Sequence, residues 1–141
     1  LMAVVVHPEI EIITAEARRL LGDSVPLSAA IRQWANLGAM VDALHRSDFD
    51  LLGRCIEDTV AEPKRAPLIP GLAAIKAAAM TAGALGASIS GSGPSLFALC
   101  RGEAVAQRVA DAMTSAVRAQ IGDGVQTYVA AIAPRGARVV A

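Results

Sequence analysis

Apolar residues form short continuous runs in some parts of this chain and recur at helical spacing in others, and this difference separates predicted strands from predicted helices. The β-branched run at residues 2–7, which stops at Pro8, predicts a buried strand. Two short strands are predicted on either side of a glycine-rich segment, and two more follow near the end of the chain. These further strands are expected near residues 86–90, 95–100, 125–132 and 137–140.

Helical spacing dominates the rest of the sequence. A stripe of apolar residues predicts one long amphipathic helix that ends near His45. The stripe comprises Leu27, Ile31, Trp34, Leu37, Val41 and Leu44. We expect the stripe and Met40 to lie in the core. Shorter helices are predicted from a cap at Thr14 to Gly22, from a cap at Ser47 or Asp48 to Ile56, over 71–83 and over 103–121. Three prolines predict an irregular, stiff connection over residues 58–70.

The order of these elements is a strand, a block of helices, and then strand, loop, strand, helix and strand. It predicts an α+β domain in which helices are layered on one face of a mainly antiparallel sheet. A chain of 141 residues is long enough for one such domain with its own core. No repeat or linker divides it, so residues 1–141 are expected to form a single domain.

Composition excludes several classes of protein. A hydrophobic content of 54% excludes a disordered chain, and no apolar run reaches the roughly 18 residues of a membrane span. Zero net charge and 3% aromatic residues argue against nucleic acid or a membrane surface as a partner. Cys55 and Cys100 have no metal or redox spacing, which predicts a reduced, cytoplasmic protein without a metal site.

Residues 88–95, Ser-Ile-Ser-Gly-Ser-Gly-Pro-Ser, carry the strongest signal for chemistry. Gly91 and Gly93 allow a positive φ and leave backbone N–H groups uncovered, so the loop can hold an anion or approach another backbone. A tight turn between two strands explains the same residues equally well. The segment lacks the lysine of a Walker A loop, the third glycine of a dinucleotide loop and the spacing of a nucleophile elbow.

The exact string at residues 86–99 closely resembles the third conserved motif of the GHMP small-molecule kinases. Four other segments are similar, in the same order, to blocks of one member family, the homoserine kinases. They are Thr14-Ala-Glu-Ala-Arg18, Asp58-Thr-Val-Ala-Glu-Pro-Lys-Arg65, Leu68-Ile-Pro-Gly71 and the tail Gly136-Ala-Arg-Val139. The resemblance implies a ferredoxin-like GHMP C-terminal domain over residues 1–141. The family's N-terminal ATP-binding domain, with its Pro-x-x-x-Gly-Leu-Gly-Ser-Ser loop, is absent from this sequence.

The resemblance also implies roles for individual residues. Arg18 and Arg65 match the two arginines that hold the substrate carboxylate in this family, and Thr14 matches a threonine near the substrate. The residues that match the motif beside the phosphate loop are Ser90, Gly91, Ser92, Gly93 and Ser95. A solvated Arg18, and an Arg65 paired with Glu62 or Asp58, remain the alternative interpretation.

The activity implied by the resemblance is transfer of the γ-phosphoryl group of ATP to the hydroxyl of L-homoserine in threonine biosynthesis. ATP and Mg²⁺ are then expected to bind mainly to the N-terminal domain, which also carries the catalytic residues, so the isolated chain is expected to be inactive. A homodimer is compatible with the family. The alternatives are another GHMP kinase, of the mevalonate type, and a non-catalytic amino-acid-binding or dimerisation module.

Overall fold

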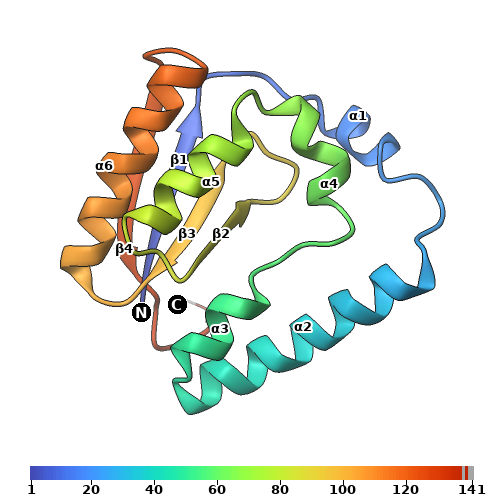
Figure 1. Cartoon of the computed structure of the whole chain (residues 1–141), viewed down its shortest axis with the longest axis horizontal. Helices are drawn as coiled ribbons and strands as arrows, with labels where there is room; N and C mark the ends of the chain where they lie inside the picture. The colour runs from blue at the N-terminus through green and yellow to red at the C-terminus, as the bar shows by residue number, and fades with distance from the viewer. Residues whose placement is uncertain (138, 140–141) are drawn as a thin grey trace.

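The computed structural model of the chain describes residues 1–137 and 139, and its strands form one antiparallel sheet (Figure 1). The strand order is β2-β3-β1-β4, and each neighbouring pair is antiparallel. The strands are β1 Met2–Pro8, β2 Gly86–Ile89, β3 Leu96–Cys100 and β4 Val125–Ala131. The predicted α+β class is therefore confirmed. The expected last strand, residues 137–140, includes positions outside the described residues.

The main core lies between this sheet and two helices, α5 (Leu72–Thr81) and α6 (Glu103–Gln120) (Figure 1). Successive strand residues point to opposite faces, so alternate residues of β1 and β3 share the helix-covered face. Val4 and Val6 of β1 and Leu96 and Ala98 of β3 are fully buried there. The same cluster contains Ile75 from α5 and Val109, Met113 and Val117 from α6.

A smaller core lies on the opposite face of β3. Helix α2 (Leu27–Arg46) is followed by α3 (Phe49–Cys55), and the Asp48 side chain accepts a hydrogen bond from the Leu51 N–H at 2.9 Å. This confirms a cap at Asp48. Leu52 of α3 and Ala43 of α2 pack against Phe97 and Leu99. The sheet thus has helices on both faces near β3, because α2 and α3 pack on the face that α5 and α6 do not cover.

The apolar stripe of α2 is not in the core, and that prediction was wrong. All six of its residues are exposed, with Leu27 at 69% and Trp34 at 64%. Helix α2 instead turns its small and polar residues inward, and Gln33 and Asn36 bond to backbone groups of Thr59 and Glu57. Hydrogen bonding to the 57–59 segment, together with the packing of Ala43 and Met40, fixes the rotation of the helix.

The connection over residues 58–70 is more regular than predicted, since it contains α4 (Glu62–Arg65) and a 3₁₀ turn, Ala66–Leu68. The Asp58 carboxylate accepts hydrogen bonds from the N–H groups of Val60 and Ala61, both at 2.8 Å, which starts the turn. Pro63 is tolerated in the first turn because its N–H would have no helical partner there. Helix α1 (Thr14–Arg19) begins at Thr14, whereas the cap position is Ile13, so the expected Thr14 cap was wrong.

Candidate functional site

Two basic side chains of α4 hold the end of α1. Arg65 donates through Nε to the carbonyl of Ala17 at 3.4 Å, and Lys64 donates through Nζ to the carbonyl of Leu21. Carbonyls at a helix C-terminus lack partners within the helix and carry partial negative charge, so cations stabilise them. The two contacts join residues 43 and 48 positions apart in the sequence and fix α1 and α4 side by side (Figure 1).

The glycine-rich loop between β2 and β3 has a packed base and an exposed tip. Its backbone is closed by hydrogen bonds from Ser90 N–H to Ser95 carbonyl (2.8 Å) and from Gly93 N–H to Ser90 carbonyl (3.2 Å). Gly91 and Gly93 have φ values of +63° and +83°, as the sequence predicted. A Cβ on Gly93 would lie 3.1 Å from Cδ1 of Ile69, whereas one on Gly91 would meet open space. Gly91 therefore forms the open tip of a fixed loop.

Arg65 joins this tip to the helices. Its Nη1 donates to the Gly91 carbonyl at 2.7 Å, while Nε of the same guanidinium is bonded to Ala17. A guanidinium has five N–H donors, so three remain after these two bonds. The N–H groups of Gly91 and Ser92 make no hydrogen bond within residues 1–137 and 139. Hydrogen-bond donors without a described partner, from the Arg65 guanidinium and from the backbone of Gly91 and Ser92, thus lie together at the tip of the loop.

The carboxylates that were the alternative partners of Arg65 are bonded elsewhere. Glu62 forms an ion pair with Lys76 and accepts a hydrogen bond from Ser88 Oγ at 2.5 Å. Asp58 is used by the backbone of its own turn. Within the part of the chain that the structure describes, Arg65 has no ion pair with a carboxylate. Its charge is therefore available to an outside anion.

Thr14 and Arg18 lie on the exposed surface of α1, one helical turn apart. Neither side chain has a hydrogen bond or ion pair to another described residue. Arg18 directly follows Ala17, the residue whose carbonyl Arg65 contacts. The structure therefore brings Arg65, Gly91 and the α1 backbone together, and places Thr14 and Arg18 on the adjoining helix without a contact of their own.

Two side-chain contacts around this site were missed by the sequence analysis. His7 bonds through Nδ1 to Ser95 Oγ at 2.8 Å, across the β1–β3 pair. Glu62 and Lys76 form the ion pair under α4, with side chains only 15% and 27% exposed. The only signal for Lys76 was a single charge within the apolar helix α5, whereas Glu62 has the closer basic neighbours Lys64 and Arg65, so the sequence did not indicate that Glu62 and Lys76 pair.

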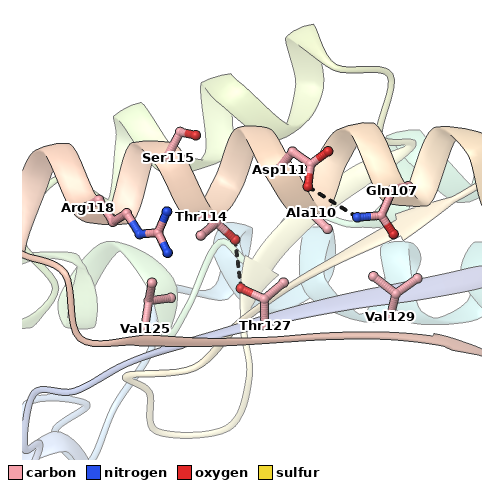
Figure 2. A pocket seen from close by; sticks show the side chains of 9 residues that line it. All are labelled: Gln107, Ala110, Asp111, Thr114, Ser115, Arg118, Val125, Thr127 and Val129. Carbon is pink, nitrogen blue, oxygen red and sulfur yellow. Dashed lines mark hydrogen bonds between the residues drawn. The ribbon is translucent and has the colours of Figure 1, made fainter.

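A separate concavity lies between α6 and the edge strand β4 (Figure 2). Thr114 and Thr127 face each other across it, with their Oγ atoms 2.7 Å apart. It contains none of the predicted site residues. The described residues contain no group of three His, Cys, Asp or Glu side chains that could hold a metal ion. No helix in the same residues is long and apolar enough to cross a membrane.

This combination of fold and loop identifies a class of protein. The family model for the C-terminal part of GHMP kinases matches residues 40–119, which extend from the end of α2 through the glycine-rich loop and almost all of α6. The chain therefore belongs to the GHMP kinase C-terminal domain family.

Within that family, the chain is similar to homoserine kinases. It is 47% identical to the homoserine kinase of Chlorobaculum tepidum over 141 residues, which cover 99% of this chain and 44% of that protein. The crystal structure of homoserine kinase from Cytophaga hutchinsonii superimposes with a TM-score of 0.89 at 44% identity, over 93% of this chain and 41% of that one. The chain thus spans less than half the length of these relatives.

A structure of mevalonate kinase from L. major in complex with R-mevalonate superimposes less closely. Its TM-score is 0.62 at 21% identity, over 91% of this chain and 42% of that one. At this identity the likeness shows a shared fold alone. The predicted resemblance to homoserine kinases is confirmed at the level of family and fold.

Proposed function

We propose that this chain is the substrate-side domain of a kinase that phosphorylates the hydroxyl group of L-homoserine. The observation that carries the proposal is Arg65, which contacts both α1 and the glycine-rich loop and has no ion pair with a described carboxylate. The identities to homoserine kinases, 47% and 44%, support the choice of substrate.

The substrate carboxylate would bind to Arg65 and Arg18. The Nε of Arg65 is occupied by Ala17, so the carboxylate would approach the end of the guanidinium, where Nη2 and the second Nη1 proton remain. Arg18 would supply a second positive charge, and the hydroxyl of Thr14 lies one turn away on the same exposed helix. A guanidinium remains charged at every physiological pH, so this grip would not depend on protonation.

The glycine-rich loop would lie against the phosphate groups. Gly91 and Ser92 offer backbone N–H groups without described partners, and these could stabilise negative charge without reorganising. Ser90, Gly93 and Ser95 would act by shaping the loop, since their backbones form the bonds that close it. ATP, when bound, supplies the phosphoryl group that becomes attached to the substrate oxygen, with loss of the hydroxyl proton and release of ADP.

The remainder of the site would come from another domain. Residues 1–141 are proposed to be one domain, and an N-terminal domain of the kind found in longer GHMP kinases would bind most of ATP and Mg²⁺. Phosphoryl transfer depends mainly on positioning and charge stabilisation, so the isolated chain is expected to show no kinase activity.

A chimera would test the proposal. This chain would replace the matching 44% of the Chlorobaculum tepidum homoserine kinase, and ADP release would be measured with L-homoserine and with R-mevalonate. Homoserine-dependent ADP release is expected from the chimera and none from the isolated chain. Preference for mevalonate would contradict the proposed substrate. If the folded chimera is inactive and calorimetry detects no homoserine binding, the alternative of a non-catalytic module is favoured.

A further inference from the structure

One side-chain hydrogen bond joins the end of the glycine-rich loop to the interior of the sheet. It links Nδ1 of His7, near the end of β1, with Oγ of Ser95, the last residue of the loop, at 2.8 Å. The two residues are 88 positions apart in the sequence, and both are half-buried. The proposed carboxylate site does not use this bond, so the bond needs an explanation of its own.

We propose that His7 is a positioning residue that holds the glycine-rich loop in the form needed for phosphoryl transfer. The inference rests on the proposed function, because it takes the N–H groups of Gly91 and Ser92 to lie against the phosphate groups. His7 acts through Ser95, by fixing the end of the loop that carries those N–H groups, rather than by contact with the reacting atoms.

The bond lies just beyond the point where the backbone pairing of β3 ends. Leu96 is the residue of β3 nearest the loop, and it is paired with Val6 of β1 and Ile89 of β2. The same register places Ser95 opposite His7. Within the described part of the chain, however, the only backbone hydrogen bond of Ser95 outside the strand pairing closes the loop itself. The side chain of His7 therefore supplies the connection between the loop and β1 that the backbone does not.

His7 is itself a rigid point of attachment. It belongs to an interior strand, since β1 pairs with β3 on one side and with β4 on the other. Its partner position on β4 is Gln126, whose Oε1 accepts a hydrogen bond from the Tyr128 hydroxyl at 2.6 Å. Among residues 1–137 and 139, Ser95 is thus the one hydrogen-bond partner of the His7 side chain. A group on a strand inside a sheet positions a site more precisely than a group on a loop.

The loop is consequently restrained at its base, its tip and its end. The Ser90 N–H closes the base on the Ser95 carbonyl at 2.8 Å, and Arg65 holds the tip at the Gly91 carbonyl at 2.7 Å. His7 holds the end, where β3 begins. Arg65 is also bonded to α1, and that bond does not depend on the loop. Loss of the His7 bond should therefore disturb the phosphate side of the site and spare the carboxylate side.

Kinetics of the chimera with substitutions at both ends of this bond would test the inference. His7→Ala should lower kcat on the order of tenfold, since phosphoryl transfer depends on the exact placement of charge-stabilising groups. It should leave KM for L-homoserine within about twofold of the parent value, because Arg65 stays attached to α1. Ser95→Ala should lower kcat by a similar factor. The double variant should lose no more than either single variant, because both substitutions remove the same bond.

Two conservative variants separate the hydrogen bond from the imidazole ring. The amide of His7→Asn places a polar atom near the position of Nδ1 and can either donate to or accept from Ser95 Oγ, so kcat should return to within about threefold of the parent value. The amide of His7→Gln lies one methylene group further out, near the position of Nε2, and should not restore kcat. A side chain that only fills space would not distinguish between these two amides.

The matched control is Thr127→Val, which removes a different short bond between side chains. Oγ atoms of Thr114 and Thr127 lie 2.7 Å apart and join α6 to β4, on the other side of β1 from the loop (Figure 2). This variant should leave both kcat and KM unchanged. Circular dichroism and thermal unfolding should show that the control and the His7 variants are folded.

Three results would each overturn the inference: an unchanged kcat in folded His7→Ala, losses that multiply in the double variant, or equal kcat values for the Asn and Gln variants. With a parent chimera that releases ADP in response to L-homoserine, these results would leave the proposed function standing. A folded parent chimera without that activity contradicts the proposed function itself and overturns the role of His7 with it.

Discussion

The guanidinium of Arg65 donates to the carbonyl of Gly91 over 2.7 Å, and this one bond ties the 62–65 helix to the exposed tip of the glycine-rich loop. The same side chain reaches Ala17 of α1 at 3.4 Å. Three segments that are far apart in sequence therefore share one charged group. Loss of this side chain should therefore alter both the charge of the site and the position of the loop.

Two substitutions of Arg65 should separate the effect of its charge from the effect of its hydrogen bond to the loop. Arg65→Ala in the chimera should raise KM for L-homoserine by about 10- to 100-fold, the range expected for loss of a charged hydrogen bond, and should also lower kcat because the loop loses its anchor. Arg65→Lys keeps the positive charge but lacks the paired N–H groups of the guanidinium, so it should recover part of the affinity for L-homoserine. Steady-state kinetics with Arg118→Ala, an exposed arginine of α6, as control would check this. Unchanged KM in Arg65→Ala would contradict the substrate assignment.

Removing Glu62 should destabilise the fold more than removing a surface carboxylate. Glu62→Gln leaves Lys76 without its ion partner at a site where both side chains are largely buried, and should lower the free energy of unfolding by about 1–3 kcal/mol. Glu57→Gln breaks a pair with Arg32 that is more than half exposed on both sides, and should cost under about 1 kcal/mol. Urea unfolding of both variants measures the difference, and equal losses would argue against a structural role for Glu62.

The two loop glycines should respond differently to substitution. Gly91→Ala and Gly93→Ala share the strain of a positive φ, about 1–2 kcal/mol, but only Gly93 would bring a Cβ to 3.1 Å from Ile69 and 3.3 Å from Ile12. Thermal unfolding should therefore show the larger loss for Gly93→Ala. The reverse order would mean that the base of the loop is not packed as described.

The two thiols should be protected in the native chain. Cys100 is 0% and Cys55 5% exposed, and burial raises the pKa of the Cys100 thiol above its ordinary value. Because the thiolate is the reactive form, raising the pH through the normal range for cysteine should produce little labelling of Cys100 until the protein unfolds. Alkylation monitored by mass spectrometry, with and without urea, would check this. Rapid labelling of Cys100 in the folded chain would contradict its burial.

Much of the fold could be predicted from local pattern. The β-branched run at residues 2–7, the runs on either side of the glycine-rich loop and the run at 125–132 predict the four described strands closely. Of the two cap candidates, Ser47 and Asp48, the structure selects Asp48, whose side chain accepts a hydrogen bond from the Leu51 N–H. The positive φ of Gly91 and Gly93 followed from residue type. These features depend on contacts within a few residues. The roles of Thr14, Arg18 and Arg65 in binding stay predictions.

The sequence by itself determined the four described strands, the longer helices, their order and the family to which the chain belongs, because periodicity, capping and motif strings are local properties. Only the tertiary structure decided which face of α2 is buried and which partner each charge takes. Glu62 sits three residues before Arg65, yet it pairs with Lys76 and Ser88, because α5 and β2 come close to it when the sheet forms. Arg65 consequently bonds to Gly91 in the glycine-rich loop and has no ion pair with a described carboxylate.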